Sequence, residues 1–399
     1  MTKRIAVIGK GTAGSLTASH FLRYAEDCEL DWYYDPSIAP QSVGEGSGLP
    51  VPINLYNNTN FNYADLDKID GTIKLGIFKS GWGEKGTPYL HTFPAPHAAL
   101  HFSANALQNF VTERAKDLYG DRLNLIEKNV SSPDEIDADY IVDCSGKPFS
   151  YKEFEESSYI PINSAYVTQC YWDYPRFQHT LTIARPHGWF FGIPLKNRCS
   201  IGYMYNSDIN SIDDIKEDLQ NVFDEYNLTP SEDTNSLSFR NYYRKKTHHE
   251  RLTYNGNASF FLDPMEATSL SNVDLINRIA FDIMNDNVDR FTANEKYLSY
   301  TREIETMIML HYFAGSVYHT EFWEHAKSRG ENCIKNATQW DNKFVTFAAS
   351  MKSLKTTNQA LFIELGSPGA DYGTWWQGSF FENFKGLGIQ DKVLSMLDI

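Results

Sequence analysis

The stretch that decides the fold lies at residues 4–22 and reads R-I-A-V-I-G-K-G-T-A-G-S-L-T-A-S-H-F-L. Its first residues are apolar and β-branched, as in a buried strand, and they lead directly into Gly9-x-Gly11-x-x-Gly14. We expect a tight turn at Gly9, close approach of a pyrophosphate to Gly11, and close helix–strand packing at Gly14. The pattern predicts a dinucleotide-binding α/β unit, and the alternative is a glycine turn that binds nothing.

Two further strands support this prediction. Residues 29–35, E-L-D-W-Y-Y-D, are expected to form a second strand that ends in a carboxylate at Asp35, where a ribose hydroxyl would find an acceptor. Residues 137–146 form a second run ending in Asp143-Cys-Ser-Gly, which either returns to the cofactor or is a plain strand with a glycine turn. No second G-x-G-x-x-G lies between a strand and a helix, so one flavin is favoured over a flavin with its own nicotinamide site. The residues expected to contact the dinucleotide from these segments are Gly9, Gly11, Thr12, Ala13, Gly14, Asp35, Asp143, Ser145 and Gly146.

Composition restricts the class of protein. The chain has 399 residues, 42% of them hydrophobic and 14% aromatic, so it can bury a large core. The net charge of −15 argues against nucleic acid as a partner. Five scattered cysteines fit a reducing compartment and argue against a disulfide framework or structural zinc. No apolar run reaches the length of a membrane span, and the N-terminal apolar run is too short for a signal peptide, so we expect a cytoplasmic protein.

Four other stretches show a resemblance to one family. They are V-G-E-G-S-G-L-P at 43–50, K-L-G-I-F-K-S-G-W at 74–82, G-W-F-F-G-I-P at 188–194 and F-L-D-P-M-E-A-T-S at 261–269. Together with the glycine cradle, they resemble the motifs of flavin-dependent tryptophan halogenases. The chain is most similar in length to compact, phage-type members, which would place it in a host cytoplasm.

The resemblance implies an α/β fold with an FAD-binding Rossmann-like unit, similar to glutathione reductase and hydroxybenzoate hydroxylase. We expect this unit at 1–150 and 240–285. An antiparallel sheet over the flavin is expected at 151–239, and a mostly helical substrate cap at 286–399. Ser211 is expected to cap a helix within the sheet region, because Asn210-Ser-Ile-Asp-Asp opens a helical pattern.

The resemblance also implies a reaction. Reduced FAD and O2 give a flavin hydroperoxide, a halide ion attacks it, and hypohalous acid forms. Lys74 would deliver that acid to an electron-rich aromatic ring, by a hydrogen bond or as an N-halo amine, and Glu266 would assist as acid–base or charge partner. Thr268 and Ser269 would hold the halide. A solvated lysine and a helix-capping carboxylate are the structural alternatives, and Lys79 is the nearest rival lysine.

The aromatic stretch at 188–194 would form a wall that keeps organic substrates away from the flavin. Three departures from the family pattern stand out: Phe191 in place of a Trp, Ala267 in place of a Ser, and Ser269 in place of a Gly. If the backbone at position 269 needs a positive φ, which glycine adopts readily, Ser269 would restrict it. Further cofactor contacts implied by the resemblance are Val43, Gly44, Glu45, Trp189, Phe191, Ile193, Pro194, Asp263 and Pro264.

The substrate site is expected at His91 and Phe93, with Trp375 and Trp376 lining the same cavity, although all four could be core residues. The short chain favours a wide pocket for indoles, phenols or anilines, with chloride, bromide or iodide as the halide. A separate flavin reductase would supply FADH2, and a homo-oligomer is an open alternative. No metal is expected, because the adjacent His248 and His249 are typical of a solvated loop. A flavin monooxygenase and a non-catalytic flavin-binding protein are the competing functions.

Overall fold

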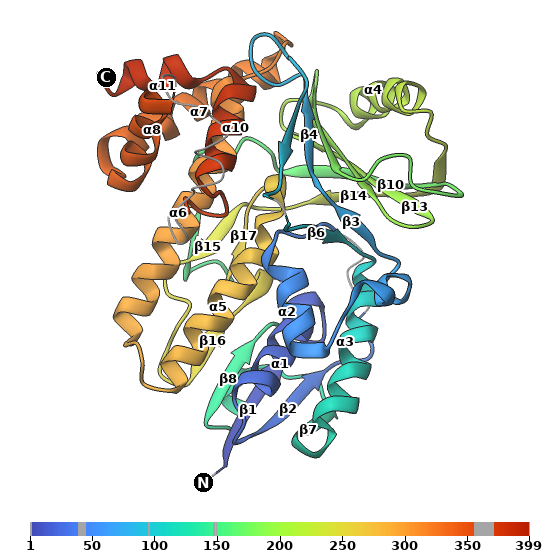
Figure 1. The fold of residues 1–399 in the computed structure, drawn as a ribbon, viewed down its shortest axis with the longest axis vertical. Coiled ribbons are helices and arrows are strands. Elements are labelled where there is room, and N and C mark those ends of the chain that lie inside the picture. Colours follow the sequence, from blue (N-terminus) through green and yellow to red (C-terminus); the bar gives the residue numbers. More distant parts are fainter. Residues whose placement is uncertain are drawn as a thin grey trace. The chain divides into compact units, whose positions relative to one another are not determined.

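The computed structural model describes residues 2–38, 45–94, 96–146, 148, 150–354 and 371–398. They form two compact units, each built from separate stretches of the chain. Unit 1 comprises Met1–Thr72, Ala99–Glu156 and Tyr242–Ser299, and unit 2 comprises Ile73–Ala98, Ser157–Asn241 and Tyr300–Ile399. The α/β class, the Rossmann-like unit and the helical C-terminal region are confirmed (Figure 1).

Unit 1 is organised around a parallel five-stranded sheet in the order β16-β8-β1-β2-β7. Successive side chains of β1 point to opposite faces of the sheet. Ile5 and Val7 pack with helices α1 and α5, whereas Ala6 and Ile8 belong to the apolar cluster on the other face. Burial on both faces is typical of a parallel sheet. The elements are β1 (Lys3–Ile8), α1 (Thr12–Tyr24), β2 (Cys28–Tyr34), α2 (Pro50–Thr59), β6 (Ala99–His101), α3 (Ala104–Tyr119), β7 (Leu123–Glu127), β8 (Tyr140–Asp143), β16 (Leu252–Tyr254) and α5 (Thr268–Met284).

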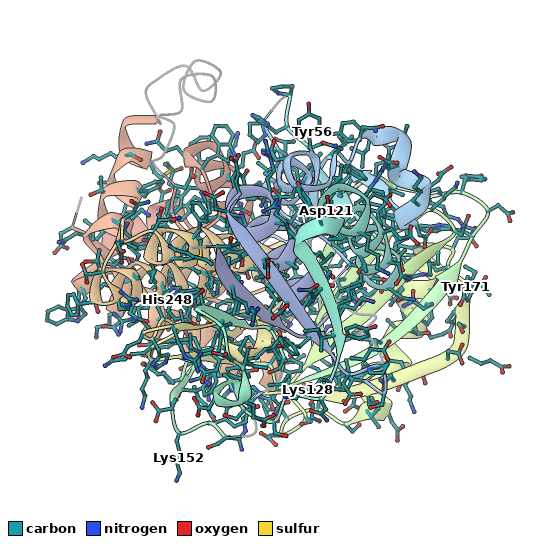
Figure 2. The ribbon with its side chains drawn as sticks, turned by 90° about the horizontal axis from the view of Figure 1, so that it is seen from below. Tyr56, Asp121, Lys128, Lys152, Tyr171 and His248 are labelled. Atoms are coloured by element: carbon teal, nitrogen blue, oxygen red, sulfur yellow. The ribbon has the colours of Figure 1, made fainter. Side chains whose placement is uncertain are left out.

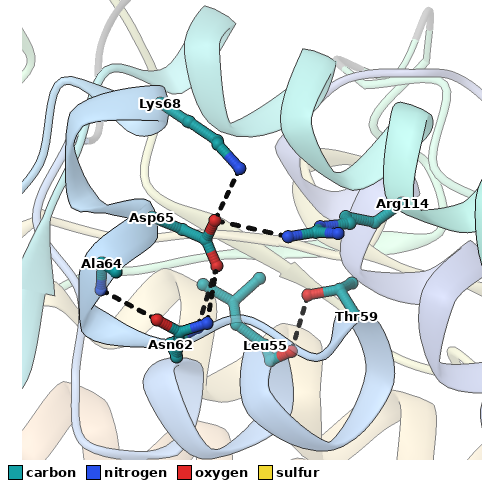
Figure 3. A network of polar contacts seen from close by, with 7 residues as sticks. All are labelled: Leu55, Thr59, Asn62, Ala64, Asp65, Lys68 and Arg114. Atoms are coloured by element: carbon teal, nitrogen blue, oxygen red, sulfur yellow. Dashed lines mark hydrogen bonds and ion pairs between the residues drawn. The ribbon is translucent and has the colours of Figure 1, made fainter.

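Polar contacts fix the periphery of unit 1. A 3-10 turn at Tyr63–Ile69 is held to α3 because the Asp65 carboxylate accepts from Lys68 Nζ at 2.8 Å and pairs with Arg114 at 3.3 Å (Figure 3). The exposed charges of Asp121 and Lys128 flank edge strand β7 (Figure 2), where charge discourages pairing with another chain.

A second sheet of unit 1 has the order β17-β15-β9, from β9 (Phe154–Glu156), β15 (Tyr242–Arg244) and β17 (Phe260–Phe261).

Unit 2 contains a seven-stranded sheet in the order β14-β10-β13-β12-β11-β4-β5. Its neighbours are antiparallel except for β11 and β4, which are parallel. One face is covered by α4 (Ile212–Glu225), which begins at the predicted cap Ser211, whose Oγ accepts from Asp214 N. The strands are β4 (Gly76–Ser80), β5 (Tyr89–Thr92), β10 (Ser164–Tyr171), β11 (Thr180–Arg185), β12 (Gly188–Pro194), β13 (Arg198–Tyr205) and β14 (Pro230–Ser238).

Strand β3 (Thr72–Lys74) and helix α6 (Arg290–Ala314) each begin in unit 1 and end in unit 2. The other C-terminal helices of unit 2 pack in one group (Figure 1). They are α7 (Glu321–Trp340), α8 (Asn342–Leu354), α10 (Gln377–Leu387) and α11 (Gln390–Met396). The sequence did not predict that β4 and β5, from residues 76–92, would join the sheet formed by residues 164–238.

Candidate functional site

The glycine cradle of unit 1 has the geometry that a pyrophosphate requires. Gly9 has φ +97°, and a Cβ there would lie 2.4 Å from the carbonyl oxygen of Cys144. A Cβ on Gly14 would lie 2.0 Å from the Gly9 carbonyl oxygen, so only glycine fits. A Cβ on Gly11, in contrast, would meet nothing within 4 Å. Helix α1 begins directly after Gly11 without a side-chain cap, so an uncapped helix N-terminus faces open space and fits a phosphate group.

The predicted acidic residues lie at the carboxyl ends of the strands beside β1. Asp35 follows β2, and its Oδ1 accepts from the N–H and hydroxyl of Ser37, which lowers the pKa of this carboxyl. Asp143 ends β8 and accepts from Ser145 N at 2.8 Å, while burial raises its pKa. Gly146 has φ +102° and open space beside it. These positions match the end of a parallel sheet at which dinucleotides bind.

Three of the other predicted cofactor residues lie in or near the cradle. Thr12 Oγ1 accepts from Gln108 of α3 at 3.2 Å, and Ala13 lies in the core beside Gly256. Glu45 is fully buried, and its Oε1 accepts from Ala104 N at 3.4 Å, at the start of α3. Val43 and Gly44 lie outside the described residues.

The segment before α5 has an unusual backbone. Glu266 has φ 68° and Ala267 has φ 53°, two consecutive non-glycine residues in the left-handed region. Asp263, which is fully buried, supports the turn because its Oδ1 accepts from Met265 N at 3.0 Å, across Pro264. Such strain costs about 1–3 kcal/mol per residue and is concentrated at functional sites. Position 269 does not require a positive φ, since Ser269 is an ordinary helical residue of α5, so the serine does not restrict the backbone there.

Helix α5 presents a second uncapped N-terminus. Its cap residue, Ala267, makes no side-chain hydrogen bond. Thr268 Oγ1 is fully buried and has no hydrogen-bond partner in the part of the chain that the structure describes. A buried hydroxyl without a partner costs about 1–3 kcal/mol unless a ligand or water satisfies it. The position therefore suits an anion that accepts hydrogen bonds.

Helices α1 and α5 run in the same direction. Leu16, in the first half of α1, belongs to the same apolar cluster as Val273 in the first half of α5, while Phe21 packs farther along with Ile283. Between these clusters Thr17 donates a hydrogen bond to Asn277 Oδ1 at 2.8 Å. The two uncapped N-termini therefore open at the same end of unit 1, where their dipoles favour negative charge together.

In unit 2, His91, which is predicted to bind substrate, lies on one face of the β4–β5 pair. Lys79 is opposite Tyr89 and Ile77 is opposite His91, so these side chains share a face. Lys74, only 1% exposed, has its Nζ 5.6 Å from the centroid of the Phe93 ring. Burial excludes the alternative of a solvated lysine.

Of the two predicted tryptophans, the structure brings only Trp375 to this face. Its ring is 6.1 Å from His91, and it is 1% exposed. The Trp376 ring instead packs over Gly378 at the start of α10, where a Cβ would lie 2.2 Å from it. His91 Nε2 makes a hydrogen bond with Ser379 Oγ at 2.7 Å.

The aromatic stretch at 188–194 forms strand β12 and divides its side chains between two faces. Phe190 belongs to the core under α4. The other face carries Trp189, Phe191 and Ile193. The ring centroids of Trp189 and Phe191 are 6.0 Å apart, and the strand ends at the buried Pro194. Trp189 is 1% exposed, and its indole N–H has no hydrogen-bond partner among the described residues, as expected of a group that meets a ligand.

Sequence reasoning missed a polar cluster next to the face that carries His91 and Trp375. Lys79 is fully buried, and its Nζ lies 2.8 Å from His311 Nε2 and 2.5 Å from Asn383 Oδ1. The alternation of β4 places Lys79 on the same side as buried Ile77, which was the available signal. Its partners come from α6 and α10, which no local pattern could connect to β4.

The predicted residues divide between the two units. Unit 1 contains the glycine cradle, the acidic residues Asp35 and Asp143, Glu266 and the start of α5. Unit 2 contains Lys74, His91, Phe93, Trp375 and β12. No group of three or more potential metal ligands occurs among the described residues. None of the helices described is both long and apolar enough to cross a membrane.

Comparison with known proteins gives a consistent result. A family model described as tryptophan halogenase matches residues 4–130 and 124–365. The chain is 24% identical over 331 residues to tryptophan 7-halogenase RebH of Lentzea aerocolonigenes, and 23% identical over 344 residues to tryptophan 6-halogenase ThaL of Streptomyces albogriseolus. These alignments cover 76% and 77% of this chain but only 57% and 62% of the relatives, less than two thirds of their length.

The fold is also similar to solved structures. A tryptophan halogenase from Shewanella frigidimarina superposes with a TM-score of 0.76 at 17% identity, covering 99% of this chain and 93% of that one. The flavin-dependent halogenase BrvH from Brevundimonas gives 0.70 at 19% identity, covering 97% and 90%.

Proposed function

Because the chain belongs to the tryptophan halogenase family, we propose that it is an FADH2-dependent halogenase that acts on an electron-rich aromatic ring. The observation that carries the proposal is Lys74, a buried lysine whose Nζ lies 5.6 Å from the ring centroid of Phe93, two residues after His91. An ammonium there can hydrogen-bond and polarise hypohalous acid, and aromatic side chains next to it can hold a flat substrate.

FAD would be held by unit 1. Gly11 and the start of α1 would receive the pyrophosphate, Asp35 the ribose, and the Asp143–Gly146 turn would lie beside the cofactor. When bound, reduced FAD would donate two electrons to O2, and the oxygen so activated would oxidise a halide ion to hypohalous acid, with water as the other product. A separate flavin reductase would provide the reduced cofactor.

The halide would be held at the start of α5. The Thr268 and Ser269 N–H groups lie in its first turn, and the left-handed pair Glu266 and Ala267 turns the chain into it. The buried Thr268 hydroxyl offers a further donor. Chloride, bromide and iodide are all compatible with N–H donors.

Lys74 and Glu266 would then carry the transfer to the ring. The substrate ring attacks the halogen, a carbon–halogen bond forms, and the oxygen–halogen bond breaks. Lys74 gives a proton to the departing oxygen, which leaves as water, and Glu266 takes the proton that the ring loses. Indoles, phenols and anilines have rings electron-rich enough for this step.

A product assay tests the proposal. The protein is mixed with FAD, a flavin reductase, NADH, O2 and catalase, and receives one halide and a panel of indoles, phenols and anilines. Mass spectrometry should detect halogenated product. Oxygenated product without halogen would indicate a flavin monooxygenase, and FAD binding without any product from the panel would favour a non-catalytic flavin-binding protein.

A further inference from the structure

Lys79 is a second fully buried lysine in unit 2, and the proposed reaction does not use it. A charged lysine is almost never completely buried unless it is paired. Its ammonium lies 2.8 Å from His311 Nε2. The other nitrogen of that ring lies 3.1 Å from the carbonyl oxygen of Met307, so the tautomer with hydrogen on Nδ1 donates there and accepts from Lys79. The lysine is thus held by α6 in a fixed geometry.

The second acceptor of Lys79 connects it to His91, one of the residues predicted to bind substrate. Asn383 Oδ1 accepts from Lys79 at 2.5 Å and from the Tyr89 hydroxyl at 3.1 Å. Asn383 Nδ2 donates to the Ser379 carbonyl one turn earlier on α10. Ser379 Oγ in turn makes the 2.7 Å hydrogen bond to His91 Nε2. A continuous set of hydrogen bonds therefore runs from Lys79 to His91.

Lys79 also contacts Trp375, another residue predicted to bind substrate. Its Nζ lies 5.6 Å from the Trp375 ring centroid and 5.7 Å from the Tyr89 ring centroid, both within the range of a cation–π interaction. The Trp375 ring is 5.7 Å from His311 as well. The orientation of this indole is consequently set by the same ammonium and imidazole.

The two lysines stand at opposite ends of one row of aromatic side chains. Tyr89, His91 and Phe93 follow at alternate positions, with Lys79 beside the first and Lys74 beside the last. Four residues of extended chain span about 13 Å. Lys79 is thus too far along the row to share the role of Lys74.

We propose that Lys79 is a positioning residue for the aromatic substrate, an inference that rests on the proposed halogenase function. Through Asn383 and Ser379 it fixes the imidazole of His91, and through direct contact it fixes the indole of Trp375. It thereby determines how tightly the substrate ring binds and which ring carbon faces the halogen.

Three variants test this role. Lys79→Met removes the ammonium, leaves the buried His311 acceptor without its Lys79 donor and leaves Asn383 Oδ1 with the Tyr89 hydroxyl as a donor, which destabilises the fold. The double variant Lys79→Met/Asn383→Leu removes one of those acceptors and replaces it with an apolar side chain, so it folds more readily. Lys385→Met, an exposed lysine on the same helix, is the matched control. Thermal unfolding and FAD binding establish that each variant is folded.

For both Lys79 variants we expect a rise of about tenfold in KM for the aromatic substrate, the size of one lost buried hydrogen bond. We also expect a wider mixture of positional isomers, a change of at most about threefold in kcat, and unchanged hypohalous acid formation without substrate. Lys385→Met should behave as wild type. Affinities for tryptophan, indole and phenol, measured by calorimetry, should fall in parallel with the rise in KM.

Folded Lys79 variants with wild-type KM, isomer distribution and ligand affinity would overturn the inference. A loss of kcat above about 100-fold at unchanged KM would also overturn it, because Lys79 would then carry the halogen itself. If the wild type yields no halogenated product at all, the proposed function fails. The calorimetry still decides the positioning role in that case: weaker binding by the Lys79 variants supports it, and equal binding contradicts it.

Discussion

Gly11→Ala should weaken FAD binding without destabilising the protein. Gly11 has φ −70° and ψ −176°, an extended conformation that alanine adopts without strain, and its Cβ would meet nothing within 4 Å. The free energy of unfolding of the protein without cofactor should therefore rise by about 0.4–1 kcal/mol, because alanine restricts the unfolded chain. The added methyl group, however, occupies the space into which we expect the pyrophosphate to come.

The cost to FAD binding follows from the hydrogen bonds at the start of α1. Displacing the pyrophosphate by a methyl group lengthens at least one charge-assisted N–H···O bond, worth about 1.5–3 kcal/mol. FAD affinity should fall by about 10- to 100-fold. The assay is a titration of flavin fluorescence, with chemical denaturation of the apo protein alongside it.

Gly14→Ala provides the contrast. Its Cβ would lie 2.0 Å from the Gly9 carbonyl oxygen, so the strand and helix must move apart and the apo protein should lose stability. A stable Gly11→Ala protein that binds FAD as tightly as wild type would refute the assignment of the cradle.

Three other changes probe the start of α5 and the acid sensitivity of unit 1. Glu266→Gln should lower kcat by about 100-fold with little change in FAD affinity, if the carboxylate accepts the ring proton; steady-state kinetics on the most active aromatic substrate would show this, and an unchanged kcat would exclude that role. Ala267→Gly should raise the free energy of unfolding by about 0.5–1 kcal/mol, because the left-handed backbone of Ala267 is strained, and denaturation should detect it. Burial, aided by the charge of His249, lowers the pKa of His248 from 6.5 to about 3, so below pH 6.5 the unfolded chain binds a proton that the folded protein does not. Between about pH 6 and pH 3 this should reduce the free energy of unfolding by about 1.4 kcal/mol per pH unit, and His248→Gln should remove that part of the slope in denaturation curves.

The sequence predicted features that depend on short segments. The strand–glycine–helix pattern at residues 4–22 determines β1, the turn and α1 by local sterics alone, and Ser211 caps α4 where the pattern placed it. Lys74 was singled out because its spacing to Trp82 lies within a single segment; its burial is observed, and its catalytic role stays a prediction. In each case the physical cause and the sequence signal lie within a few residues of one another.

Features that depend on distant segments were not predictable. The Lys79 cluster joins β4, α6 and α10, and its polar residues have no shared periodicity. The left-handed backbone at Glu266 and Ala267 was not predicted, because the position of such residues depends on where the helix begins. Trp375 and Trp376 are adjacent residues of the same type, and only the path of the chain into α10 places their side chains in different surroundings.

The most direct test of the central claim compares wild type with Lys74→Met in the halogenation assay with FAD, flavin reductase, NADH, O2, halide and aromatic substrates. Catalase is present, and a soluble trap reports hypohalous acid separately. The account predicts halogenated aromatic product from wild type only, with hypohalous acid still formed by Lys74→Met. Equal yields of halogenated aromatic from the two proteins would contradict it, because halogenation would then not pass through the buried lysine.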